Sequence, residues 1–142
     1  MVLISGIGKA QTVEAIPNRD FENWDSSFYN ILDSPWVTSN PAAVANIGTP
    51  NVTKVAGFNG QAAHIQTDIV NGDTLVGEIS NTGDHAFGVP YTQMPTAVQG
   101  YYRCRMTGLD TGFLFIGFIK GGNIYYDKLI PFYGNVSSFT FF

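Results

Sequence analysis

The chain has 142 residues, a length that indicates one domain whose core is large enough to fold without disulfide bonds. Apolar residues make up 44% and charged residues only 13%, while Gly, Phe and Tyr are plentiful, which favours an all-β extracellular domain. The net charge of −4 and the scattered positions of the Lys and Arg residues exclude a cationic stripe for nucleic acid, and no apolar run reaches the roughly 20 residues of a membrane span.

The first ten residues are short, apolar and rich in small side chains. Two interpretations of residues 1–10 stay open: the remnant of a secretory signal peptide cut before Gln11, or an ordinary first strand. In either case residues 11–142 are predicted to form a single β-sandwich domain.

Strand patterns dominate the rest of the chain. Apolar spacing typical of a helix comes close only at 21–32, so we expect at most one short helical turn there. Gly121 and Gly122 predict a tight hairpin, because glycine accepts positive φ at both turn positions. Period-two or continuous apolar runs bounded by Gly, Pro, Asn or Asp predict strands at 12–16, 36–39, 52–56, 62–69, 74–79, 98–106, 112–120, 123–130 and 137–142.

The strand predicted at 98–106 contains the single cysteine, Cys104. One cysteine forms no internal disulfide and builds no zinc site alone, and its place in an alternating strand favours a small buried hydrophobe over a nucleophile. Alternation puts Tyr102, Cys104 and Met106 on the core side and Tyr101, Arg103 and Arg105 on a polar, aromatic surface.

Four segments together resemble a known family. They are 18–24 (Asn-Arg-Asp-Phe-Glu-Asn-Trp), 35–38 (Pro-Trp-Val-Thr), 60–67 (Gly-Gln-Ala-Ala-His-Ile-Gln-Thr) and 88–103, where a loop with two prolines leads into Gly-Tyr-Tyr-Arg. In this order they resemble secreted jelly-roll modules of Bacteroidetes, most of all a family of carbohydrate metabolism domains similar to galactose-binding-like and carbohydrate-binding-module sandwiches. The resemblance implies a jelly-roll β-sandwich of two antiparallel sheets.

The end of the chain departs from that pattern. Sugar-binding jelly rolls of this kind often close with a Gly-x-x-Leu-x-x-Asp-Asp type strand, whereas this chain ends at Phe-Thr-Phe-Phe. Two interpretations stay open: the C-terminal strands are lacking, or 137–142 is itself the closing strand. In the first case an apolar edge is left for another chain to pair with.

The resemblance implies a secreted or cell-surface module that binds carbohydrate and has no chemistry of its own. Planar aromatic side chains stack on sugar rings while charged side chains bind hydroxyls, so the candidate ligand-binding residues are Tyr101, Arg103, Arg105 and Asp127. The competing interpretation, which the sequence favours, is that these residues form cross-strand pairs that only stabilise a sheet. On the second strand of the predicted hairpin, Tyr125 and Asp127 alternate with Tyr126 and Lys128, so one of these pairs faces outward.

The resemblance also implies a structural Ca²⁺, since related jelly rolls hold one with a carboxylate like that of Glu22, with Asp20 nearby. Calcium needs about six to eight oxygens, and the acidic C-terminal motif is absent, so two solvated surface acids are the favoured interpretation. Trp24 and Trp36 are predicted to lie in the core rather than to bind sugar.

No motif marks an enzyme. The chain has no His-Glu-x-x-His, no Gly-x-Ser-x-Gly and no phosphate-binding glycine loop, and His64 and His85 are predicted to be structural or solvated. We therefore expect no catalysis, and the alternative to a carbohydrate-binding module is a structural or adhesive spacer domain without a small-molecule ligand.

Overall fold

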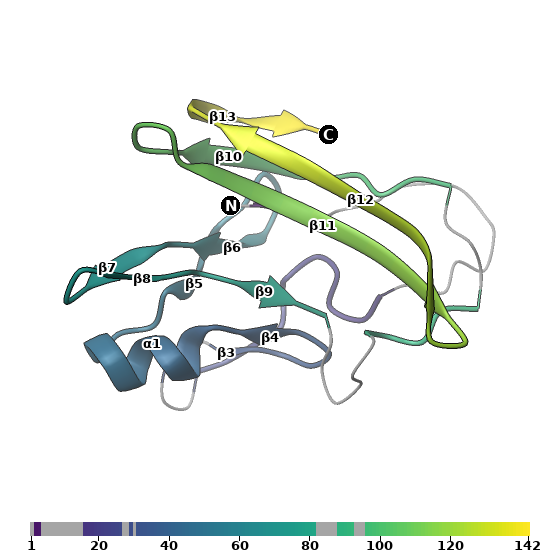
Figure 1. Ribbon diagram of the computed structural model, residues 1–142, viewed down its shortest axis with the longest axis horizontal. Coiled ribbons are helices and arrows are strands. Elements are labelled where there is room, and N and C mark those ends of the chain that lie inside the picture. The colour runs from purple at the N-terminus through teal and green to yellow at the C-terminus, as the bar shows by residue number, and fades with distance from the viewer. Residues whose placement is uncertain (1, 4–15, 27–28, 30, 82–87, 93–95) are drawn as a thin grey trace.

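A computed structural model describes residues 2–3, 16–26, 29, 31–81, 88–92 and 96–142. This part of the chain is mostly β-strand with one short helix, and its strand pairs are antiparallel. Figure 1 shows a layer made by β10–β13 above a second layer of shorter strands, with α1 at the lower edge. The predicted all-β, sandwich-like fold is confirmed.

The elements of the described residues are short except at the C-terminal end. In chain order they are β1 (Val2–Leu3), β2 (Trp24–Asp25), β3 (Ile31–Leu32), β4 (Val37–Thr38), α1 (Asn40–Ile47), β5 (Val52–Ala56), β6 (Gln61–Ile65), β7 (Asp68–Val70), β8 (Asp73–Leu75), β9 (Ile79–Ser80), β10 (Tyr101–Arg105), β11 (Thr111–Lys120), β12 (Asn123–Tyr133) and β13 (Asn135–Phe141).

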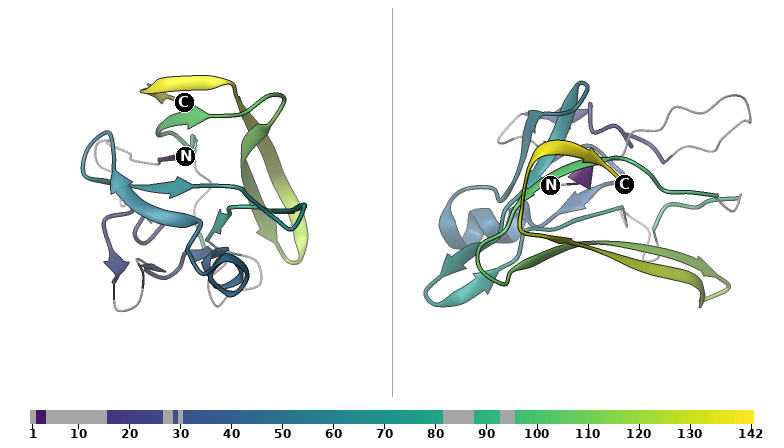
Figure 2. Two further views of the ribbon diagram at one scale, coloured as in Figure 1. Left: turned by 90° about the vertical axis from the view of Figure 1, so that its left-hand side faces the viewer. Right: turned by 90° about the horizontal axis from the view of Figure 1, so that it is seen from above.

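Hydrogen bonding groups these strands into one three-stranded sheet, in the order β1-β10-β13, and the pairs β11-β12, β2-β3, β4-β9, β5-β6 and β7-β8. Seen end-on, β10 and β13 lie across the top while the β11-β12 hairpin descends along one side (Figure 2). Within the described residues β13 is therefore an edge strand.

The predicted hairpin at Gly121-Gly122 is confirmed. Both glycines have positive φ, +59° and +79°, and they join β11 to β12. The pairing runs from Lys120↔Asn123 at the turn to Thr111↔Tyr133 at the far end, with a bulge after Phe118. This hairpin is the longest ladder in the described part of the chain.

The core lies between the layers. Its buried residues form one hydrophobic cluster of Phe21, Leu32, Ala62 and Ala63. Trp24 and Trp36 pack against this cluster, which confirms the prediction that they belong to the core. Each indole donates its Nε1–H to the backbone, Trp24 to the carbonyl of Phe21 and Trp36 to the carbonyls of residues 17 and 18. These bonds satisfy the polar end of each half-buried ring.

The helix lies in a segment for which no element was predicted. At most one short helical turn was expected at 21–32, and the described residues there form no helix, because β2 and β3 pair as short strands. Helix α1 instead occupies 40–47, a segment bounded by Pro41 in its first turn and by Gly48, whose φ of +76° ends it. The first turn of a helix accommodates proline, and glycine readily adopts the left-handed conformation that ends one, so the local sequence determines both ends of α1.

Helix α1 is held by its first residue. Asn40 is fully buried, donates from Nδ2 to the Val52 carbonyl at 2.8 Å and accepts the Val52 N–H at 2.7 Å. The side chain thus pairs with β5 as a neighbouring strand would. Its buried polar atoms are satisfied, as burial requires.

The predicted first strand at 12–16 and the segment 4–10 lie outside the described residues, apart from Ile16, and so does His85. No helix in the described part of the chain is long and apolar enough to cross a membrane.

Candidate ligand-binding site

Strand β10 presents the alternation that its sequence predicts. Cys104 is buried, with 6% of its surface exposed, and its Sγ lies 3.6 Å from the Tyr133 carbonyl. Tyr102 shares that side and packs against Phe132, with 4.4 Å between ring centroids. Arg103 and Arg105, from the opposite side, are exposed.

Tyr101 departs from the expected open surface. It is half-buried and packs against the core cluster, and Phe58 lies flat on its ring with centroids 3.9 Å apart and planes 9° apart. A ring face covered in this way is not free to receive a sugar. The exposed ring of the pair is Phe58, which has 56% of its surface open to solvent.

Two more side chains complete this group. Phe139 of β13 meets Phe58 edge-on at 6.2 Å, and the Arg103 guanidinium carbon lies 5.0 Å from the centre of the Phe139 ring. We call Phe58, Tyr101, Phe139 and Arg103 the Phe58 platform. Aromatic pairs in these geometries and a cation over a ring face attract one another, so each side chain fixes the position of the next.

The turn that carries Phe58 is held from a distant part of the chain. It joins β5 to β6, where the Gly57 N–H donates to the Gly60 carbonyl at 2.9 Å. Glu22 accepts the Gln61 N–H at 2.7 Å, and its carboxylate lies over Gly60, whose φ is +77°. A Cβ at Gly60 would displace that carboxylate, and the positive φ favours glycine there.

This contact bears on the implied calcium site. One Glu22 oxygen is engaged with the Gln61 N–H, and Asp20 is exposed. Across the described residues no group of three or more His, Cys, Asp or Glu side chains is placed to hold a metal ion. We assign no metal to Glu22 and Asp20.

His64 lies on β6, across from Thr53 of β5, with its Nδ1 3.5 Å from the threonine hydroxyl. Desolvation lowers the pKa of His64 below its ordinary value of 6.5, and the positive charge of Arg103 lowers it further. The ring is therefore neutral near pH 7. A neutral imidazole both donates and accepts hydrogen bonds.

The remaining predicted residues are not brought together with the platform. Asp127 lies on β12 opposite Gly117, in the β11-β12 ladder rather than the β10 sheet. It shares its exposed face with Tyr125, because Tyr126 and Lys128 line a pocket on the other face. Arg105, at the end of β10, is paired with Asn135. Of the four predicted ligand residues, the structure joins Tyr101 and Arg103.

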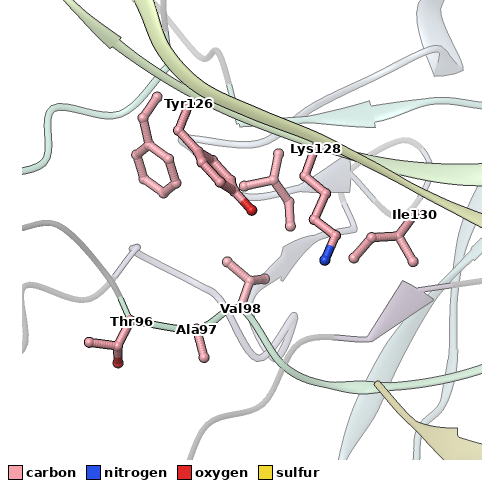
Figure 3. A pocket seen from close by; sticks show the side chains of 8 residues that line it. Thr96, Ala97, Val98, Tyr126, Lys128 and Ile130 are labelled. Atoms are coloured by element: carbon pink, nitrogen blue, oxygen red, sulfur yellow. The ribbon is translucent and has the colours of Figure 1, made fainter.

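That pocket was not predicted. It has a volume of about 350 Å³ and lies between residues 96–98 and the inner face of the β11-β12 hairpin (Figure 3). The alternation of Tyr126 and Lys128 was its only sequence signal. Its lining residues are Thr96, Ala97, Val98, Ile116, Phe118, Tyr126, Lys128 and Ile130.

Fold and site together define a sandwich-like β-protein with an aromatic surface platform. Comparison with known proteins yields no matching family model, no matching curated protein and no matching solved structure.

Within the fold, the segments that suggested a family meet in the core. Phe21 of the first segment packs edge-on against Trp36 of the second at 5.0 Å, and Ala62 of the third lies in the same cluster as Phe21. Tyr101 of the fourth packs against that cluster. These motifs thus build the framework, while Phe58 lies outside all four.

Proposed function

We propose that the protein is a secreted or cell-surface, non-catalytic carbohydrate-binding module that holds an oligo- or polysaccharide on the Phe58 platform. The observation that carries this proposal is the Phe58 ring, which has 56% of its surface exposed and is stacked on Tyr101 with 3.9 Å between ring centroids. The ring thus offers a flat apolar surface whose position is fixed by a neighbour.

The chemistry of the platform suits a sugar. The apolar face of a pyranose ring stacks on an aromatic ring, and its hydroxyls require donors and acceptors close by. Arg103 supplies donors through a guanidinium already positioned over Phe139. Because Tyr101 and Phe139 hold Phe58 and Arg103 in place, binding orders few side chains, which lowers its entropic cost.

A glycan array with the purified protein tests the proposal, followed by calorimetry on any hit. We expect Phe58→Ala to weaken binding about tenfold or more, which corresponds to roughly 1.4 kcal/mol. Arg103→Ala should weaken it as well. The matched control is Phe113→Ala, which removes a similarly exposed phenylalanine, 63% open, from strand β11 outside the platform.

Near-UV circular dichroism confirms that each variant is folded. Binding that survives Phe58→Ala, or that Phe113→Ala weakens equally, would place the sugar elsewhere. A folded parent that binds no glycan would remove the proposal.

The β13 edge favours a second candidate, a structural or adhesive spacer that pairs with another chain. In the described residues β13 bonds to β10 on one side only, and Phe141 on it is 56% exposed. An open edge strand is a template for strand pairing. Sedimentation over a range of concentrations tests pairing between copies, and a monomer at every concentration would contradict it.

A further inference from the structure

We propose that the pocket beneath the β11-β12 hairpin is a second binding site, separate from the Phe58 platform, for a small amphipathic carboxylate: a compound with one anionic head and an apolar body. The proposal rests on how one cation is placed among apolar side chains, and it does not depend on the proposed function.

The pocket walls come from three strips of chain. The inner face of β11 supplies Ile116 and Phe118, and β12 supplies Tyr126, Lys128 and Ile130. Register places Ile116 opposite Lys128 and Phe118 opposite Tyr126, so cation and rings form one continuous surface. Residues 96–98 form the facing wall.

The polar groups converge on one region. Figure 3 shows the Tyr126 hydroxyl and the Lys128 ammonium both directed toward the wall that carries Thr96 and Val98. The neighbours of Lys128 on its own face are aliphatic or aromatic. The nearest acid in sequence, Asp127, projects from the opposite face of the hairpin.

The charge of the pocket lining indicates whether a ligand there is anionic, cationic or neutral. Among the described residues that line the pocket none is acidic, and Lys128 is the one charged group, placed beside apolar walls. A carboxylate entering there gains a charge-assisted hydrogen bond from Lys128 and has a hydroxyl donor available from Tyr126. A cation would meet like charge, and a fully apolar compound would gain no charge-assisted hydrogen bond from the exposed ammonium.

The volume sets the size of the apolar body. A cavity of about 150 Å³ holds one benzene molecule, so a pocket of about 350 Å³ accommodates a body of roughly two fused or linked rings. It falls at the lower end of the range for small-molecule sites, about 300–1,000 Å³.

Naphthalene-2-acetate is a suitable probe, and its neutral amide is the matched ligand control. Calorimetry measures both affinities, and methyl NMR locates the ligand through Ile116 and Ile130. Ile69, exposed on β7, serves as the internal reference. We expect the carboxylate to bind at least about fivefold more tightly than the amide. Among labelled isoleucine methyls it should shift those of Ile116 and Ile130 and leave that of Ile69 unchanged.

Two lysine variants identify the cation. Lys128→Met keeps the apolar stem and removes the charge, so the preference for carboxylate over amide should vanish while the amide still binds. Lys120→Met removes a lysine from the same hairpin outside the pocket, and the preference should remain. Lys128→Gln repeats the charge removal if Lys128→Met does not fold.

Several results would overturn the proposal: equal affinity for carboxylate and amide, a carboxylate preference that survives in Lys128→Met, binding without shifts at Ile116 and Ile130, or no binding at millimolar ligand. Because these variants leave the Phe58 platform intact, a failed glycan array does not affect the outcome.

Discussion

Replacing Asn40 with alanine removes the side chain that joins helix α1 to strand β5. In the folded protein both amide atoms of Asn40 bond to the backbone of Val52, at 2.8 and 2.7 Å, and both residues have no exposed surface. Asn40→Ala therefore leaves one buried donor and one buried acceptor of Val52 without partners.

The size of the loss follows from those two groups. Each buried group left unsatisfied costs about 1–3 kcal/mol, so together they cost about 2–6 kcal/mol. We expect about 2 kcal/mol, because water that enters the vacated space satisfies one of the two groups and leaves the cost of the other. With a urea dependence of about 2 kcal/mol per molar, the unfolding midpoint falls by about 1 M.

Urea unfolding followed by tryptophan fluorescence measures this shift, with Asn46→Ala as the control. Asn46 lies on the same helix and its Nδ2 also bonds to a carbonyl, that of Ala42 at 2.8 Å, but it is exposed to water. Its replacement should change the free energy of unfolding by less than about 0.5 kcal/mol. If the two variants lose equal stability, burial is not what makes Asn40 important and the reasoning fails.

Two further predictions concern the ends of β6. Gly60→Ala should destabilise the protein by about 1 kcal/mol more than Gly72→Ala. Both glycines have positive φ, but only the new Cβ at Gly60 displaces Glu22 from its bond to the backbone. Equal losses of stability in thermal unfolding would contradict this. The pKa of His64 is lower in the folded protein than in the unfolded chain. Neutral His64 therefore contributes fully to the free energy of unfolding above pH 6.5, and this contribution is lost as the pH falls through the pKa of the folded protein. The free energy of unfolding should thus fall less steeply between about pH 7 and pH 5 in His64→Gln, and an unchanged slope would contradict the shift.

Much of the strand pattern could be predicted because it depends on neighbours in sequence. Strand β5 has the expected bounds, and the Gly121-Gly122 turn follows from φ preference alone. Burial of Cys104 follows from period two. Helix α1 was missed because it has only eight residues and buries only Asn40 and Ala43, so it carries no apolar stripe; Pro41 and Gly48 would have marked its ends.

The candidate sites depend on tertiary contacts and were less predictable. Alternation was enough to put Tyr101 and Arg103 on one side of β10. It gave no sign that Phe58, from the turn between β5 and β6, covers the tyrosine ring, because a turn residue has no period that fixes its direction. The pocket needs residues 96–98 to face the hairpin, which no local pattern encodes.

The hydrogen bond between Glu22 and the turn after β5 shows that the residues that hold this turn differ from the residue exposed at its tip. Neither that bond nor the buried core cluster includes the Phe58 side chain. Chains of this architecture can therefore keep the same framework residues while the tip of the turn varies, much as antibody loops vary on a constant scaffold. Under the proposed function, the framework motifs answer to the demands of folding and the residue at position 58 to those of the ligand.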